Sequence, residues 1–234
     1  MKKSLFAFLA AAMLTLFCSA AALAYNPGQR TFELLGSTLN SDKHPVHMVV
    51  SQTIDMKDVL TPEAYAKLTP DKQKRVNITE YNEANGINGE INIIKDGSGN
   101  IISHKNSFVK GGYWYTIDYI NKSYDRLPEL PGMSLPFAET LVSWFSSKPE
   151  AGYDVNTGWD YDVVTKGTNT LRFYFERGTN NWKGYEVSYL PMFTVLEYGE
   201  TVDAETAFAL PPDGFKQEAN QTMRNYANRL MQRK

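Results

Sequence analysis

The chain of 234 residues is poor in the side chains on which most catalytic and metal sites depend. It has one cysteine, Cys18, and three histidines. His44 and His47 are three residues apart, so a strand would place them on opposite faces, and His104 is remote from both. Ligands of one metal ion normally converge, and we therefore expect exposed histidines here. The sequence also lacks a G-x-S-x-G motif, a phosphate-binding loop and a cysteine-nucleophile motif.

An excess of positive charge is also absent. The whole chain carries 24 Lys+Arg against 26 Asp+Glu. Residues 1–24 contain two lysines and no acidic residue, so the remaining chain has 22 basic and 26 acidic residues, a formal charge of −4. This balance gives no electrostatic case for binding nucleic acid.

The N-terminal residues have the three parts of an export signal. Lys2 and Lys3 are followed by an apolar run from Leu5 to Cys18 and then by Ala22-Leu23-Ala24. Signal peptidase cuts after such a small-x-small pattern, and we expect cleavage after Ala24. The alternative is an uncleaved membrane anchor, because residues 4–24 carry no charge and are long enough to span a bilayer.

Two further consequences follow from this export signal. Lipid attachment at Cys18 is disfavoured, because Thr15 and Phe17 stand where a lipoprotein has leucine and a small residue. Cleavage after Ala24 would leave a chain without cysteine, so no disulfide could form. The domain must then be held together by its apolar core.

Hydrophobic periodicity predicts one domain over residues 25–234, with a helix at its C-terminus. Helices are expected at 30–39, at 59–75 as two short pieces, at 137–147 and at 217–230. Alternating residues predict strands at 46–54, 87–93, 113–120, 159–163, 171–175, 185–189 and 192–198, and a hairpin turn at 96–100. This order predicts an α+β fold, in which a strongly curved antiparallel sheet of about nine or ten strands forms a half-barrel with helices covering its concave side.

The segment from Asp203 to Gly214, DAETAFALPPDG, predicts the local structure at the end of the sheet. Asp203 can cap a single helical turn. Phe208 and Leu210 are expected to share one face and to plug the edge of the sheet. The prolines at 211 and 212 would then block that edge against further pairing.

With the preceding strands from Leu171, this segment resembles the C-terminal part of the LolA/LolB-like superfamily, the bacterial periplasmic carriers of lipoproteins. Its pattern D-x-x-x-F-x-L-P-x-G is similar to the passage that locks the last strand in that family. The resemblance implies a periplasmic, non-catalytic carrier that binds a lipid or the acyl chain of a lipoprotein between a curved sheet and lid helices. It implies a lipid or acylated protein as partner and no cofactor.

Aromatic side chains on the predicted strands are the candidate ligand-binding residues, because apolar ligands are bound mostly by such residues. A helix over 137–147 would present the underside of a lid. The candidates are Tyr113, Tyr115, Tyr119, Trp159, Tyr161, Phe173, Phe175, Tyr185 and Tyr189 on the strands, and Phe137, Leu141, Trp144 and Phe145 on the lid. The same aromatics could equally form a filled core.

Two other functions remain open at this stage. The first is an envelope protein-interaction or assembly module on the same fold, with its contacts made by aromatic outer faces and the C-terminal helix. The second is a glycan-cleaving enzyme that uses Asp160 and Asp162 as a carboxylate pair. Alternation around Tyr161 favours a simpler interpretation, in which both aspartates lie on the solvent face of a half-buried strand.

Overall fold

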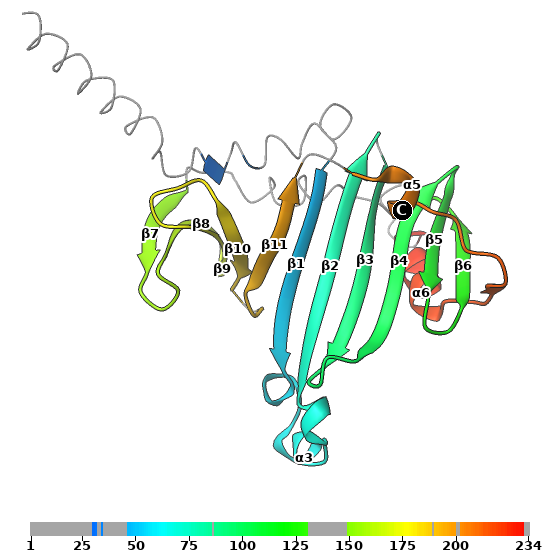
Figure 1. Cartoon of the computed structure of the whole chain (residues 1–234), viewed down its shortest axis with the longest axis horizontal. Helices are drawn as coiled ribbons and strands as arrows, with labels where there is room; N and C mark the ends of the chain where they lie inside the picture. Colours follow the sequence, from blue (N-terminus) through cyan, green and yellow to red (C-terminus); the bar gives the residue numbers. More distant parts are fainter. Residues whose placement is uncertain are drawn as a thin grey trace, which may run out of the picture.

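The computed structural model describes residues 30, 31, 34, 46–85, 87–130, 149–188, 190–199 and 202–231. Twelve strands of this part form one sheet in the order β12-β6-β5-β4-β3-β2-β1-β11-β10-β9-β8-β7 (Figure 1). The elements are β1 (Val46–Asp55), η1 (Met56–Asp58), α3 (Pro62–Tyr65), η2 (Pro70–Lys72), β2 (Lys74–Ala84), β3 (Ile87–Asp96), β4 (Ile101–Lys110), β5 (Tyr113–Asp118), β6 (Ser123–Pro128), β7 (Glu150–Asp154), β8 (Trp159–Lys166), β9 (Asn169–Phe175), β10 (Trp182–Val187), β11 (Phe193–Gly199), α5 (Ala204–Ala207), β12 (Lys216–Gln217) and α6 (Gln221–Met231). The predicted signal peptide and the predicted helix over 137–147 lie outside the described residues.

The predicted α+β half-barrel with a helix-covered concave side is wrong. The described residues form one large mixed sheet, in which β12 pairs in parallel with β6 and the other neighbours pair antiparallel. The sheet is open, with β7 and β12 at its two edges. The described helices are too few and too short to form a layer over it, since α3 and α5 have four residues each.

The prediction of two short helical pieces over 59–75 is confirmed, since α3 and η2 each begin at a Thr-Pro pair. Thr61 caps α3 by accepting a hydrogen bond from the backbone N–H of Ala64, as the Thr-Pro pattern predicts. Pro70 lacks a backbone N–H and disfavours a helical residue before it, so no helix continues through this point. The chain then enters β2, which the sequence analysis missed because polar residues stand on both of its faces.

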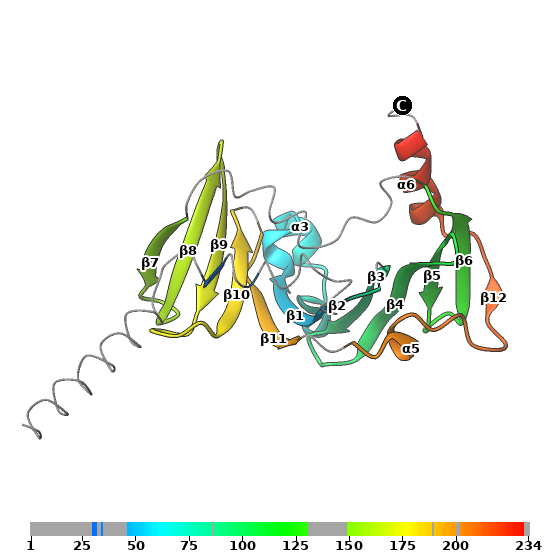
Figure 2. The same ribbon diagram turned by 90° about the horizontal axis from the view of Figure 1, so that it is seen from above.

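The sheet is curved into a trough (Figure 2). Its two ends, β7–β10 and β5–β6, rise on the same side of the middle strands, and α6 lies on that side, whereas α5 lies on the opposite side. We call the face that α6 contacts the inner face and the face that α5 contacts the outer face. The two faces carry two separate hydrophobic cores, over different halves of the sheet.

The inner core covers β1 and β8–β11. Its fully buried members are Met48, Val50, Leu171, Phe173, Phe175 and Tyr185, and partly buried side chains such as Leu34, Tyr81, Trp182 and Tyr198 pack against them. The alternating residues of β9 that the sequence predicted as one apolar stripe all belong to this core. At the β1–β11 side, therefore, side chains fill the trough.

The outer core lies under the other half of the sheet and is closed by the segment around α5. Asp203 caps α5, as predicted, and Phe208 is 2% exposed against Phe108, with ring centroids 6.0 Å apart. Leu210, however, is 53% exposed, so its predicted role as a plug is wrong. Phe208 also lies over β3 and β4 in the interior of the sheet, near Gly89, and does not close an edge.

Asp160 and Asp162 on β8 are buried, being 5% and 0% exposed, so the prediction of a solvent face is wrong. They pair across the sheet with Phe175 and Phe173 of the inner core. Both carboxylates face the guanidinium of Arg30, which supplies the compensating charge. The sequence correctly predicted that Asp160 and Asp162 share one face of β8. That face is the inner, buried face and not the solvent face.

Candidate ligand-binding groove

The floor of the candidate site is the inner face of β2–β5, beyond the inner core. One residue from each of these four strands pairs directly with the next, so the four form a row on the same face: Tyr81, Glu90, Ser107 and Thr116. Tyr81 also packs against the inner core, so the row begins where the filled part of the trough ends. The floor changes from apolar to mostly polar at this point.

Helix α6 forms the wall above this floor. Met223 and Tyr226 point towards the sheet, and the ring of Tyr226 meets the edge of Trp114 at a centroid distance of 5.8 Å. Between the helix and the strands lies an open groove of about 650 Å³, which we call the α6 groove. Polar side chains of the floor and apolar side chains beside the helix line this groove together. The lining residues are Tyr81, Glu83, Asn88, Gly89, Glu90, Asn92, Lys105, Ser107, Phe108, Val109, Trp114, Thr116, Asn220, Thr222, Met223, Tyr226 and Arg229.

A buried carboxylate anchors α6 to the sheet. Asp125 on β6 is 1% exposed and accepts hydrogen bonds from Nε and Nη2 of Arg224, each at 2.8 Å. It also accepts one from the backbone N–H of Asn220, at 2.8 Å. Burial alone would raise the pKa of Asp125, but these hydrogen bonds outweigh it, so the pKa lies below its usual value. The position of the groove wall therefore depends on a charged Asp125.

The charges inside the groove are unevenly compensated. Lys105 is drawn to Asp118, with Nζ and Oδ2 3.7 Å apart. Burial raises the pKa of Glu90, and a hydrogen bond with the Asn92 side chain offsets part of that rise. Burial, together with the charge of Glu90, raises the pKa of Tyr81 to about 12, so its hydroxyl stays protonated at neutral pH. Protonated hydroxyls and amides beside a carboxylate are suited to binding a polar group without reacting with it.

The groove contains no arrangement typical of a metal centre. Within the described ranges, no three His, Cys, Asp or Glu side chains are placed to hold one metal ion. His47, one of the three histidines, instead contacts Asn82 through Nδ1 at 2.9 Å on the outer face. Among the described helices, none is both long and apolar enough to cross a membrane.

Eight of the predicted ligand-binding aromatics are described, and none of them lines the α6 groove. Phe173, Phe175 and Tyr185 belong to the inner core, in contact with one another and with Trp182. Tyr115 is buried in the outer core, whereas Tyr113 beside it is 40% exposed.

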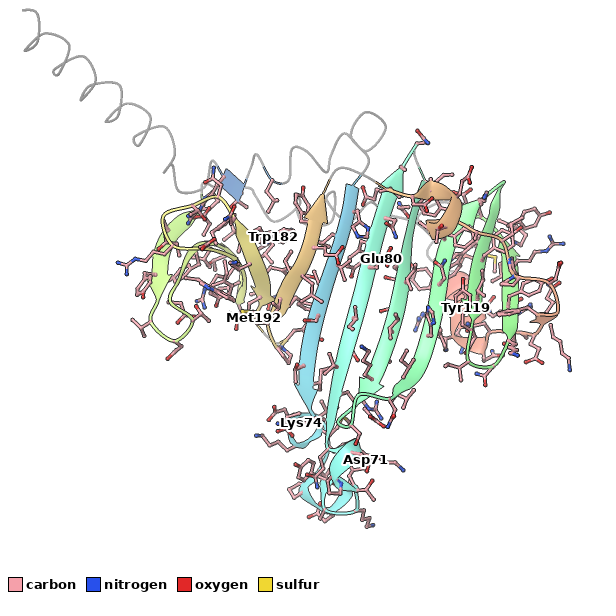
Figure 3. The ribbon with its side chains drawn as sticks, in the orientation of Figure 1. Asp71, Lys74, Glu80, Tyr119, Trp182 and Met192 are labelled. Carbon is pink, nitrogen blue, oxygen red and sulfur yellow. The ribbon has the colours of Figure 1, made fainter. Side chains whose placement is uncertain are left out.

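The other predicted aromatics are spread over the outer face. Tyr119 lies between His104 and Phe215 at one end of the sheet, far from Trp182 of the inner core (Figure 3). Trp159 and Tyr161 lie at the opposite end, on β8, against Tyr174. The structure therefore does not bring these eight side chains to one surface. Phe137, Leu141, Trp144, Phe145 and Tyr189 lie outside the described residues.

Sequence reasoning missed the groove for two reasons. Tyr81 belongs to β2, where polar residues on both faces conceal the alternation. Glu90 belongs to β3, which was predicted as a strand, but its alternation does not indicate which face borders a cavity. The helix wall was partly visible, because Met223 and Tyr226 fall on one predicted apolar face of the C-terminal helix. The alternation of β5 also separated Trp114 from Tyr115 correctly, but it could not indicate which of the two faced a cavity.

Comparisons with known proteins leave the chain without an assigned family, since no family model and no curated protein matches it. An uncharacterized conserved protein from Thermus thermophilus aligns over 81% of this chain and 99% of its own, with 10% identity and a TM-score of 0.42. PNGF-II, in its C2 and P21 crystal forms, aligns over 77% and 78% of this chain, with 9% identity and a TM-score of 0.28. This chain spans about a third of PNGF-II, 32% and 33% in the two forms. We infer neither fold nor function from likenesses this weak.

Proposed function

We propose that this protein is a non-catalytic binding protein of the bacterial periplasm that carries a lipid or a lipoprotein acyl chain in the α6 groove. The observation that supports the proposal is the groove itself, about 650 Å³ in volume. This volume lies within the range of small-molecule sites, which are usually apolar with a few placed polar groups. The proposal moves the ligand away from the predicted aromatics to a site beside α6.

The apolar part of the ligand would lie along the α6 wall. Met223, which is 3% exposed, and Tyr226 of α6 form the apolar side of the groove together with Trp114 and Val109 of the sheet. Each acyl CH₂ removed from water contributes about 0.8 kcal/mol, so part of one chain gives useful affinity. No covalent step is needed, because burial alone retains the ligand. The location rests on the N-terminal export signal and on the resemblance to periplasmic carriers.

Native mass spectrometry tests the proposal directly. The protein is purified from a periplasm without detergent, and its mass is measured before and after solvent extraction. We expect adducts in the mass range of a lipid that disappear on extraction. A ligand-free mass, with no uptake of added phospholipid, would contradict the proposal.

A pair of matched variants locates the site. Val109→Trp places a large ring in the groove and is expected to abolish loading. Val155→Trp makes the same substitution in the turn between β7 and β8, where Val155 is 79% exposed, and is expected to load normally. Equal loading of the two variants would place the ligand elsewhere on the protein.

A second candidate function, a protein-interaction module, is favoured by one feature of the outer face. Trp159 and Tyr161 meet Tyr174 edge-on, at centroid distances of 6.1 and 6.2 Å, and the Arg172 guanidinium lies 4.5 Å from the centre of the Tyr161 ring. Trp, Tyr and Arg are the residues enriched at interface hot spots. Sedimentation over a range of concentrations would test for self-association, which Trp159→Ala should weaken if this surface is used.

A further inference from the structure

We infer that the α6 groove selects amphiphiles whose polar head is cationic or a neutral hydrogen-bond donor, and that it discriminates against free fatty-acid anions through Glu90. This inference rests on the proposed function, because it specifies the class of ligand that the same groove accepts. It concerns the polar floor, whereas the proposed function concerns the apolar wall.

Two carboxylates lie on the floor of the groove, on adjacent strands. Glu83 of β2 is 4% exposed, and Glu90 of β3 is half-buried. Glu83 pairs with Asn88, and Tyr81 pairs with Glu90, so the two glutamates are diagonal neighbours on the inner face. The β2–β3 side of the groove is therefore acidic.

Neither of the two basic residues of the lining forms an ion pair with Glu90. Lys105 is engaged by Asp118, and no lysine or arginine nitrogen of the described residues lies within ion-pair distance of the Glu90 carboxylate. Arg229 is exposed near the end of α6, with its guanidinium 6.0 Å from the centre of the Tyr226 ring. Apart from Glu83, the polar neighbours of Glu90 on the floor, among them Ser107 and Thr116, are neutral.

The polarity of the floor determines which head groups it accepts. A carboxylate head would lose its hydration beside Glu90 and would face a charge of the same sign, which is unfavourable in a partly desolvated site. A protonated amine, a hydroxyl or an amide N–H would instead donate a hydrogen bond to Glu90, and bonds to an ionised acceptor are the stronger ones. The N–H of an N-acyl amide is such a neutral donor, whereas an ester group only accepts hydrogen bonds.

Three probes with the same alkyl chain test the inference: dodecylamine, dodecanol and dodecanoate. Binding is measured by titration calorimetry below the concentration at which each aggregates, at a pH of about 8, where carboxylates are ionised and alkylamines protonated. We expect the amine to bind at least about tenfold more tightly than the carboxylate, with the alcohol between them.

Two variants separate the effect of Glu90 from that of net charge. Glu90→Gln is expected to reduce the amine-to-carboxylate ratio by about tenfold. Glu205→Gln removes the same charge from the exposed outer side of α5 and is expected to leave the ratio unchanged. If Glu90→Gln failed to fold, the relative affinities of the three probes for the unaltered protein would still test the selectivity.

The outcomes distinguish the inference from the function on which it rests. Equal affinity for the amine and the carboxylate, or tighter binding of the carboxylate, would overturn the selectivity and leave the carrier proposal standing. Equal ratios in the two glutamine variants would overturn the role of Glu90. Binding of none of the three probes would overturn the carrier proposal itself.

Discussion

Arg30 donates hydrogen bonds to both carboxylate oxygens of Asp162, a residue 132 positions later in the chain. Its Nη2 lies 2.9 Å from Oδ1 and its Nε lies 3.3 Å from Oδ2. Thr31 donates to the same carboxylate at 2.6 Å, and the Arg30 guanidinium stands over the Phe175 ring at 4.3 Å. Both charged residues are buried, 3% and 0% exposed. The pair therefore ties the helical residues before β1 to the β8–β9 end of the sheet.

Removing Asp162 should strongly destabilise the protein. Asp162→Ala removes the carboxylate that accepts two hydrogen bonds from the buried Arg30 and leaves the guanidinium with longer contacts, such as that with Asp160 at 4.0 Å. Breaking a buried pair in this way costs about 3–5 kcal/mol. Asp213→Ala removes an exposed carboxylate and should leave the free energy of unfolding almost unchanged. Urea denaturation of the two variants measures the difference, and similar midpoints would show that the pair does not stabilise the fold.

The double variant Arg30→Met/Asp162→Leu refines this prediction. The charges of Arg30 and Asp162 are then replaced by apolar side chains, and such replacements of a buried pair are often neutral. Asp160 loses its contact with the guanidinium but still accepts a hydrogen bond from the backbone N–H of Gly178, at 2.9 Å. We expect the double variant to be more stable than Asp162→Ala alone. A double variant that is less stable than the single one would indicate that the ion pair itself, and not the desolvated charge, dominates.

The anchor of α6 should be lost in acid. The pKa of Asp125 is lowered in the folded protein, so the anchor contributes stability above the unfolded value of about 3.9 and loses it as the pH falls through the lower folded value. The protection factors of the α6 amides, which compare the measured exchange with the intrinsic rate at the same pH, should therefore fall below a pH of about 4. In Asp125→Asn, the protection factors should be lower already at neutral pH and should lack this fall in acid. An unchanged fall in that variant would assign it to another group.

Gly184 on β10 is expected to be irreplaceable. A Cβ at this position would overlap the backbone carbonyl oxygen of Phe193 on the paired strand β11. Gly184→Ala must then push two strands apart, and overpacking of this kind costs about 1–3 kcal/mol. Gly199→Ala is the control, because no atom lies within 4 Å of its added Cβ. Thermal unfolding should rank Gly184→Ala well below the control, and equal melting temperatures would contradict the prediction.

Local signals in the sequence predicted individual elements well. The alternating residues over 159–163 and 171–175 form β8 and β9, Asp96 begins the turn between β3 and β4, and Asp203 caps α5. Each of these features is decided by neighbours within a few residues. Strand β2 was missed because polar residues stand on both of its faces, among them Thr79 on one face and Glu80 on the other. In the sheet Thr79 donates a hydrogen bond to Asn92 on β3, a partner that only strand pairing supplies.

By itself, therefore, the sequence determined which residues share a face of a strand, where several turns and caps fall, and that the apolar side chains suffice for a core. Only the tertiary structure decided which face lies inside. A strand has two equivalent sides, and the buried side is the one on which a distant segment packs: Arg30 on Asp162, and Phe208 on Phe108. The α6 groove has the same origin, because it exists only where α6, held by Asp125, stands over the polar floor of β2–β5.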